Sequence, residues 1–297
     1  MQATTTAALA LALALAGCGG DGDGAAPEGD AEGQAVRQNP VAQAAQRTLE
    51  QGTARIAYDA AFEGVEGSYS FNAEGAVDYA QHRTRLDYDM TNLPGTGNED
   101  VDVFIDGPTV LVRFPEDSPD VKLPEGKEWV RIPPPAEPEG GDEGEEQPPP
   151  EFDLAGVQQD PTQFLRYLQT GAIDVQEEDF REEVRGTQTR TYTALIDLGR
   201  VLEHGAADLG GDDEHRKRAR RTVEGLQVQL AGNPLPVTVS IDEEGLVRRL
   251  LITFDLKPPG GGGTISALTT TEYYDFGADV DVEPPPDETI IDAADVE

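Results

Sequence analysis

The chain has little of three residue types on which many folds and active sites depend. Of its 297 residues one is cysteine and three are histidine, and 22 basic residues stand against 58 acidic ones, a formal net charge of −36. A single cysteine excludes an internal disulfide, so a packed core must supply the stability. The acidic excess opposes affinity for nucleic acid and for anionic membrane surfaces, and we expect no nucleic-acid partner.

The sequence also lacks an apolar run long enough to cross a bilayer. The run Ala7–Gly17 is well short of the ~20 residues that a membrane span requires, but it suits the hydrophobic region of a signal peptide. It leads into Leu15–Cys18, whose residues Leu-Ala-Gly-Cys resemble the lipobox of bacterial lipoproteins. Met1–Thr6 departs from a usual signal peptide because it carries no Lys or Arg. We expect residues 1–17 to be a signal peptide that is cleaved between Gly17 and Cys18.

Cleavage at a lipobox leaves a cysteine that carries a diacylglyceryl group, commonly with palmitate chains. Each buried CH₂ contributes ~0.8 kcal/mol, and two or more chains give stable membrane attachment. We therefore expect an extracytoplasmic protein that is anchored to the cell membrane through Cys18.

Two segments have too few large apolar side chains to fold. Residues 18–38 begin with Cys18 of the lipobox and are rich in Gly, Asp and Glu, which is typical of a disordered acidic tether. Residues 133–152 are acidic, contain two proline triplets and predict a disordered insertion in a loop. A calcium site is the alternative for the insertion, but its carboxylates lack EF-hand spacing.

No arrangement of residues indicates catalysis. The sequence has no G-x-S-x-G motif, and its thiol is committed to lipid. His82, His204 and His215 lack metal-ligand spacing and are expected at the surface. Acidic pairs are too numerous to identify a glycosidase. We expect no enzyme activity, no cofactor and no metal.

Alternating apolar residues predict short strands joined by local turns. Turns are expected at Gly64–Gly67, Glu74-Gly75, Gly107 and Asp242–Gly245. Such a succession is typical of an antiparallel sheet with one face in water. The expected strands cover Ile56–Phe62, Tyr69–Phe71, Val77–Tyr79, Leu86–Met90, Val101–Ile105, Val110–Phe114, Trp129–Ile132, Val237–Ile241, Leu250–Leu256 and Thr264–Phe276.

Helices are expected at four places. Asn39 caps the first, which begins at Pro40 and carries an apolar stripe through Leu49. The others are one from Asp160-Pro161 to Gly171, a short one over Leu198–Glu203, and a long one from Asp212-Asp213 to the Gly232–Pro234 stop.

Several short motifs, taken in order, resemble the LppX/LprG-type lipoproteins of actinobacteria, which are relatives of the lipoprotein carriers LolA and LolB. The resemblance covers residues 39–292 and leaves 293–297 as a tail. The acidic insertion and the loop Gly260–Gly263 depart from the pattern. The motifs are the lipobox, Tyr88–Pro94, Glu128–Val130, Asp160-Pro161, Arg190–Tyr192, Leu235–Val237, Ile241-Asp242, Gly245–Arg248 and Tyr274–Gly277.

The resemblance implies an α+β fold, mainly β: a curved antiparallel half-barrel sheet with helices covering the concave face and enclosing a cavity for acyl chains. On the sequence alone a filled core is the favoured interpretation of the apolar strand faces, and the resemblance reverses this preference. The candidate cavity-lining residues are Ile56, Tyr58, Phe62, Tyr69, Phe71, Leu86, Tyr88, Met90, Val237, Val239, Leu250, Ile252 and Phe254.

A basic cluster marks the start of the long helix. At 100° per residue it lies opposite the apolar stripe of Ala219, Val223, Leu226 and Leu230. Such a face can contact anionic head groups. A solvated face, partly neutralised by residues 212–214, is the favoured alternative. The candidate head-group residues are Arg216, Lys217, Arg218, Arg220 and Arg221.

Together these features predict a lipid-anchored envelope lipoprotein that binds or carries the acyl chains of a lipid or other amphiphile. The alternative is a non-enzymatic structural or interaction lipoprotein of the envelope with a filled core. Its protein partner is not predicted by any motif.

The lipobox yields a first testable prediction. Replacing Cys18 with Ser should leave an unlipidated or uncleaved precursor, because the lipidation and cleavage steps both act at this residue. Intact-mass measurement of envelope protein checks it. A wild-type mature chain that begins elsewhere, or that carries no acyl mass, would refute the lipobox assignment.

Overall fold

The strands of the protein form one sheet. The structure is a computed structural model that describes residues 39–296, apart from 65–66, 90–99, 108, 116–117, 119–120, 133–161, 205–212, 231 and 257–263. In this part of the chain twelve strands have the order β12-β6-β5-β4-β3-β2-β1-β11-β10-β9-β8-β7. The strands are β1 (Thr53–Gly64), β2 (Gly67–Asp78), β3 (Arg83–Asp89), β4 (Asp100–Asp106), β5 (Thr109–Arg113), β6 (Trp129–Ile132), β7 (Ala172–Val184), β8 (Thr187–Ile196), β9 (Leu235–Asp242), β10 (Val247–Leu256), β11 (Ile265–Tyr274) and β12 (Ile290–Asp292).

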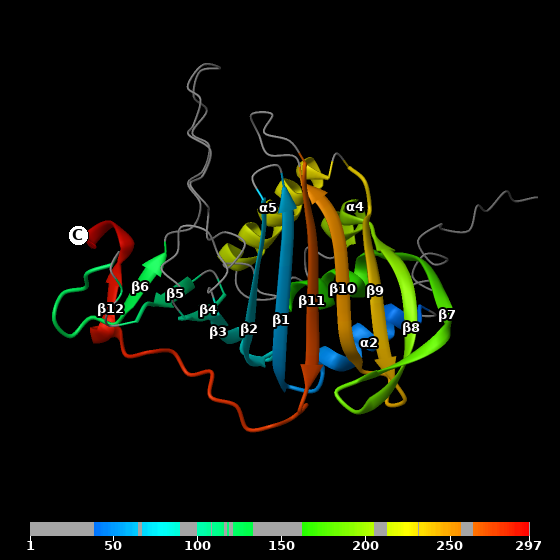
Figure 1. The fold of residues 1–297 in the computed structure, drawn as a ribbon, viewed down its shortest axis with the longest axis horizontal. Helices are drawn as coiled ribbons and strands as arrows, with labels where there is room; N and C mark the ends of the chain where they lie inside the picture. Colours follow the sequence, from blue (N-terminus) through cyan, green and yellow to red (C-terminus); the bar gives the residue numbers. More distant parts are fainter. Residues whose placement is uncertain are drawn as a thin grey trace, which may run out of the picture.

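The sheet is curved, and its helices lie on the concave side (Figure 1). Neighbouring strands are antiparallel except β12, which pairs with β6 in parallel. This confirms the predicted fold class, α+β and mainly β. The helices are α2 (Pro40–Leu49), α3 (Gln163–Gly171), α4 (Leu198–His204) and α5 (Asp213–Gln229), with short 3-10 turns at Asp287–Thr289 and Ala293–Asp295.

The helices occur at the four predicted places. The side chain of Asn39 caps α2 by accepting hydrogen bonds from the backbone N–H groups of Val41 (3.0 Å) and Ala42 (3.2 Å). Its amide also donates to the carbonyl of Ala172 at 2.9 Å, which ties the start of α2 to β7. The predicted first residues of α3, Asp160-Pro161, lie outside the described residues. No described helix is long and apolar enough to span a membrane.

The turn predicted at Glu74-Gly75 is wrong, because β2 continues through both residues. A Cβ atom on Gly75 would lie 1.9 Å from the carbonyl oxygen of Arg85 on β3, so this glycine permits a close approach of two backbones. The chain turns after Asp78 instead. There Asp78 Oδ1 accepts from the backbone of Ala80 and Gln81, both at 2.9 Å.

Two long strands, β7 and β8, were missed. Acidic residues dominate β7, and its pairing with β8 is interrupted by register shifts, so its apolar alternation is weak. The available signal was Arg185-Gly186, which joins the two strands with positive φ angles of 48° and 82°.

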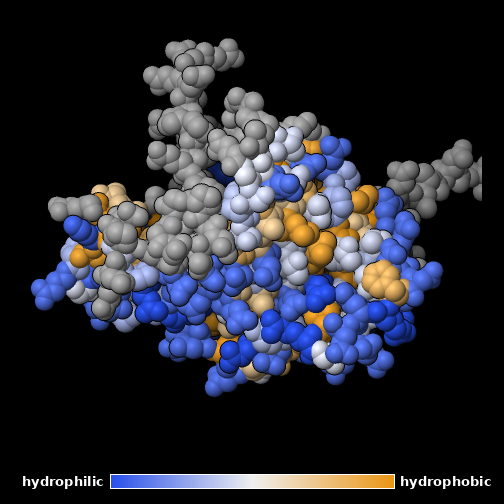
Figure 2. All heavy atoms as spheres, viewed as in Figure 1, coloured by the Kyte–Doolittle hydropathy of each residue, from blue (hydrophilic) through white to orange (hydrophobic). Residues whose placement is uncertain are grey.

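The convex face carries charged side chains from successive strands. Arg249 on β10 donates to Glu182 and Glu272, each at 2.7 Å. On β4, Asp102 accepts from Arg85 and Arg113, also at 2.7 Å. Figure 2 shows this face, where hydrophilic side chains cover the lower part and a more hydrophobic strip lies above.

The sheet was predicted to have one face in water, but β4 is buried on both faces. Phe104 and Asp102 are 1% and 5% exposed on the convex side. Phe104, Leu111 and Trp129 form a second small cluster, with Ile290 of β12 packed against it. The C-terminal strand therefore helps to exclude water from this end of the outer surface.

Gly75 allows a matched test of the fold. Gly75→Ala should destabilise the protein by more than the ~1–3 kcal/mol typical of overpacking, because the new methyl group meets backbone that cannot rotate away. Gly225→Ala on α5 is the control. Nothing lies within 4 Å of a Cβ atom there, and Ala stabilises a helix by up to ~1 kcal/mol relative to Gly. Urea denaturation of both variants checks the prediction, and equal effects would contradict it.

Candidate binding site on the concave face

Strand register brings the predicted cavity residues together in rows on the concave face. In one row Val239, Leu250, Thr271, Tyr58, Ala73, Tyr88 and Val101 stand opposite one another from β9 to β4. The next row contains Val237, Ile252, Thr269, Ala60 and Phe71. The predicted residues with described positions therefore share one surface. Met90 lies outside the described residues.

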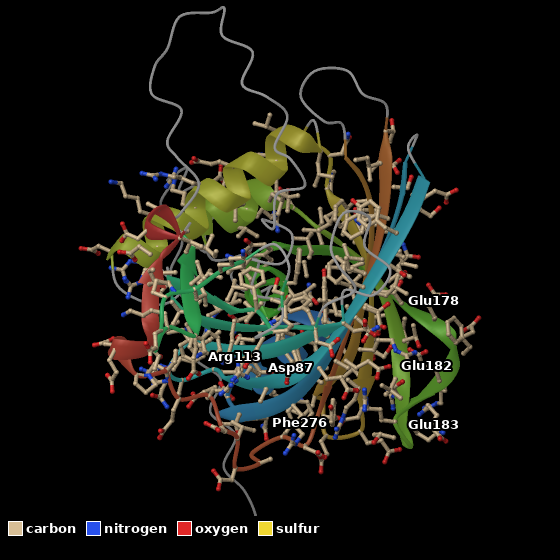
Figure 3. The ribbon with its side chains drawn as sticks, turned by 60° about the vertical axis from the view of Figure 1, so that its left-hand side comes forward. Asp87, Arg113, Glu178, Glu182, Glu183 and Phe276 are labelled. Atoms are coloured by element: carbon tan, nitrogen blue, oxygen red, sulfur yellow. The ribbon has the colours of Figure 1, made fainter. Side chains whose placement is uncertain are left out.

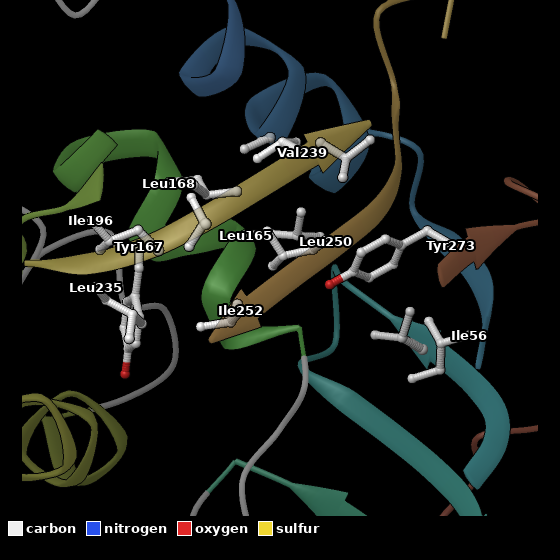
Figure 4. Packing of buried hydrophobic residues seen from close by; sticks show 14 of the residues in the cluster. Ile56, Leu165, Tyr167, Leu168, Ile196, Leu235, Val239, Leu250, Ile252 and Tyr273 are labelled. Atoms are coloured by element: carbon white, nitrogen blue, oxygen red, sulfur yellow. The ribbon is translucent and has the colours of Figure 1, made fainter. Parts of the chain in front are cut away.

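The middle of this surface is filled. Ile56, Leu86 and Val239 have no exposed area, and Leu250 and Ile252 are 1% exposed. A side chain without accessible area has no water-sized space beside it, so these residues pack as a core. Figure 4 shows Leu250, Ile252 and Tyr273 facing Leu165 and Leu168 of α3.

The packing loosens toward one end of the strands. A further row, which we call the rim row, consists of Phe254, Ala267, Phe62 and Tyr69 on β10, β11, β1 and β2. Its three aromatic residues are only partly buried, although they pack against the main cluster. Phe62 stacks on Tyr69 with ring centroids 4.9 Å apart, and lies 6.0 Å from Phe71. The rim row is thus an apolar surface that is continuous with the core and partly open.

The interior has a low polarity. Burial raises the pKa of the Tyr58 hydroxyl well above its ordinary value, because the charged form would lose its hydration. Among the described residues, the buried charged ones are Asp102 and Asp242, and neither belongs to the main cluster. The middle of the concave face and the rim row therefore offer dispersion contacts and burial to an apolar ligand rather than charge recognition.

The sequence predicts the strand Thr264–Phe276, but no residue of β11 is among the candidate cavity-lining residues, although this strand lies at the centre of the surface. Its inward positions are Ala267, Thr269, Thr271 and Tyr273, and all are buried. Small and hydroxyl side chains at three of these positions obscure the alternation. The inward residues of β11 could be identified by their position at every second residue of the strand, but not by their hydrophobicity.

Two pockets on the described surface lie away from the predicted cavity residues. One, of about 380 Å³, lies between α2 and the ends of β8 and β9. The other, of about 520 Å³, is formed by residues 174–176 of β7 and 193–195 of β8. Neither includes any of the predicted lining residues.

The basic cluster lies on the N-terminal half of α5, which covers the open side of the half-barrel opposite the sheet (Figure 3). Lys217, Arg220 and Arg221 are exposed. Arg216 pairs with Asp213, and Arg220 pairs with Glu224 at 2.9 Å. Part of the charge is therefore neutralised within the helix, as a solvated face requires. The side chain of Arg218 lies outside the described residues.

Several predicted features cannot be placed. The signal peptide, Gly17, Cys18, the tether and the insertion 133–152 all lie outside the described residues. In the described part no cluster of His, Cys, Asp and Glu could hold a metal ion. His82 is half-buried, and its Nδ1 lies 2.7 Å from a guanidinium nitrogen of Arg166 on α3.

No protein-family model matches the chain, and no curated protein matches it. Similar solved structures include the lipoprotein LppX of Mycobacterium tuberculosis, at 14% identity and a TM-score of 0.40, covering 82% of this chain and 98% of that one. LprF from Mycobacterium bovis is 12% identical with a TM-score of 0.37, covering 82% and 96%. A putative outer membrane lipoprotein-sorting domain from Vibrio parahaemolyticus is 11% identical with a TM-score of 0.22, covering 82% and 95%. Similarity at this level supports no conclusion about ligand or activity.

The difference between the core and the rim row can be tested on a single strand. Ile252→Asp should abolish cooperative folding, because an unpaired carboxylate in a sealed core costs several kcal/mol of a total stability of ~5–15 kcal/mol. Phe254→Asp, two residues further on the same face, should cost clearly less because water reaches this position. Thermal unfolding followed by circular dichroism compares them. Equal melting temperatures would show that the two positions do not differ in packing.

Proposed function

We propose that the protein is a lipid-anchored lipoprotein outside the cytoplasm that binds the acyl chains of a lipid or other amphiphile between its sheet and its helices, without catalysing a reaction. The observation that carries this proposal is the rim row, an aromatic surface that is partly open and continuous with a large uncharged interior. The lipobox at Leu15–Cys18 supports the anchor.

Because the interior is filled, a chain must displace protein to enter it. Of the described side chains of α5, Val223 is buried and Leu226 is half-buried, and Leu230 follows directly after the helix. Exposing these side chains costs about 1.5–3 kcal/mol each, or roughly 5–9 kcal/mol together. Relative to water, burying a 16-carbon chain returns about 12 kcal/mol at ~0.8 kcal/mol per CH₂. For a lipid whose chain has left the bilayer, this gain exceeds the cost of exposing the α5 side chains and favours an α5 that moves aside, while α2, with five buried residues in ten, stays in place.

The exposed cations of α5 suit this role. Lys217, Arg220 and Arg221 lie on the helix that would move, where they can contact anionic head groups during transfer. Cosedimentation with vesicles of phosphatidylglycerol and of phosphatidylcholine tests this part. Equal binding to both vesicles, or binding that survives replacement of all three residues by Gln, would contradict it.

The alternative is a structural or interaction lipoprotein, and the filled middle of the concave face favours it. Native mass spectrometry of gently extracted protein separates the two functions. A carrier should retain a copurifying lipid, whereas a filled structural domain should give the mass of the lipidated chain alone.

A binding experiment tests the carrier directly. The mature chain, residues 18–297 with Cys18→Ser, should bind a fluorescent fatty-acyl probe, and Phe62→Ser should weaken binding about tenfold because the probe loses an aromatic contact surface. Leu268→Ser is the matched control. Leu268 lies opposite Ala61 on the convex side and is 42% exposed. Probe displacement and melting temperature are measured together, and absence of wild-type binding would refute the carrier function.

A further inference from the structure

A groove lies at the opposite end of the concave face from the rim row. It has a volume of about 380 Å³ and is bounded by α2 on one side and by the ends of β8 and β9 on the other. Val247 begins β10 and Phe254 lies two residues before its last residue, Leu256. Val247 stands opposite Ile241, which lines the groove. We call this site the basal groove.

The floor of the basal groove is apolar and its edges are cationic. Ala44, Tyr192 and Ile241 form the floor and are 1%, 8% and 6% exposed. Arg47 and Arg190 line the same groove, and both are exposed. Arg190 shares the concave face because it stands opposite Ile241 across the β8–β9 pair. An apolar surface beside two guanidinium groups matches the two parts of an anionic amphiphile.

With 58 acidic and 22 basic residues in the chain, most arginines are expected to pair with a carboxylate. Arg47 and Arg190 differ from this expectation. Within the part of the chain that the structure describes, no carboxylate pairs with Arg47. Arg190 meets Glu177 only at 3.8 Å, with both side chains more than half exposed, so this contact contributes little. The carboxylate of Asp242, which also lines the groove, is engaged by Arg248 and by the backbone of Glu244 and Leu246.

The fold holds Arg47 in place. The hydroxyl of Thr48 donates to the carbonyl of Ala44 (2.8 Å) and accepts from the backbone of Val247 (2.9 Å), which pins α2 to the first residue of β10. Gly245 has φ +80°, and a Cβ atom there would lie 2.3 Å from Nη1 of Arg47. The guanidinium therefore rests directly on the β9–β10 turn, in a position that a larger residue at 245 would deny it.

We propose that the basal groove binds the anionic head group, a phosphate or carboxylate, of a membrane amphiphile. Arg47 and Arg190 contact the head group, and the first carbons of the chain lie on Ala44, Tyr192 and Ile241. Glu243 on the adjacent turn opposes the anion and limits its affinity. This inference rests on the proposed lipid-binding function. Pro40, at the edge of the groove, is joined to Cys18 by residues 19–39, which reach at most about 70–75 Å, so a membrane-anchored groove stays close to its source of amphiphiles.

The test measures selectivity for charge on the mature chain, residues 18–297 with Cys18→Ser, by isothermal titration calorimetry. The probes are dodecyl phosphate, the neutral monolauroylglycerol, and inorganic phosphate. Wild type should bind dodecyl phosphate at least tenfold more tightly than monolauroylglycerol, because each guanidinium adds charge-assisted hydrogen bonds. Inorganic phosphate should bind far more weakly, since it lacks the chain that the floor contacts.

Variants that remove a positive or a negative charge from the groove should change the affinity in opposite directions, which distinguishes a binding site from a structural contact. Arg47→Gln should weaken dodecyl phosphate binding roughly tenfold and leave monolauroylglycerol unchanged. Gly245→Asn should do the same, since it displaces the guanidinium without removing its charge. Glu243→Gln should tighten binding a few-fold. Arg55→Gln, which removes an equal charge from an exposed pair with Asp275, is the control and should have no effect.

Each remaining outcome is decisive. If monolauroylglycerol and dodecyl phosphate bind equally, or if Arg47→Gln and Glu243→Gln have no effect, the basal groove is not a head-group site while the carrier function stands. If inorganic phosphate binds as tightly as dodecyl phosphate, the ligand is free phosphate and the amphiphile assignment is overturned. If no amphiphile binds to wild type, both the inference and the carrier function fail.

Discussion

Pairing of β1 with β11 is the interaction on which the rest of the structure depends. Strands β1–β6 and β7–β11 each form a succession of sequence neighbours, and β1–β11 joins the two successions into one twelve-stranded sheet. Its register, with Tyr58 opposite Thr271 and Phe62 opposite Ala267, makes the apolar rows continuous from one half to the other. A slip by one residue would turn every inward side chain of one half toward water. Hydrogen bonds between Thr53 and residues 277–278 secure the end of this pairing.

The convex face has to accommodate an excess of carboxylates, and arginines make this feasible. Asp87 stands directly opposite Asp102, an arrangement that is destabilising without a cation nearby. Burial and the charge of Asp102 raise the pKa of Asp87 above its ordinary value. Arg85 and Arg113 bind Asp102 and lie over the ring of Trp129, at 5.6 and 5.3 Å from its centroid. Figure 3 shows Asp87 and Arg113 in this region. It also shows Glu178 and Glu182 on β7, the strand at the opposite edge of the sheet.

The arginines of the convex face thus stabilise the fold by pairing with carboxylates, which outnumber them. Burial alone raises the pKa of Glu272, but hydrogen bonds from Arg249 and Arg185 outweigh it and hold the pKa below its usual value. Removing either arginine would leave a half-buried carboxylate with less compensation. The arginines of the convex face are therefore paired with carboxylates. Arg47 pairs with no carboxylate among the described residues, so its charge is available for an anion from outside the protein.

Local patterns predicted most of the elements, while features set by distant contacts could not be predicted. The Asn39-Pro40 start of α2 and the strand Trp129–Ile132 follow from capping and alternation, which are local. Gly75 was misassigned because a glycine in a turn and a glycine beneath a neighbouring strand look alike in sequence. The parallel pairing of β12 with β6 joins residues about 160 positions apart, and no local pattern encodes it. For the site, alternation identified the inward faces correctly, but only packing distinguishes the sealed Ile252 from the half-buried Phe254.

The two ends of the concave face differ in chemistry, and their separation limits how one ligand can use both. Phe254 and Val247 are seven residues apart on β10 (254 − 247), or roughly 23 Å at ~3.3 Å per residue. Between them Leu250 and Ile252 are 1% exposed, so a chain running from the basal groove to the rim row must pass beneath helices that now fill this space. A lipid held at both ends would therefore separate helices from sheet along the whole of β10. A lipid held at one end would open only that end, and the filled centre would then act as the wall between two distinct sites.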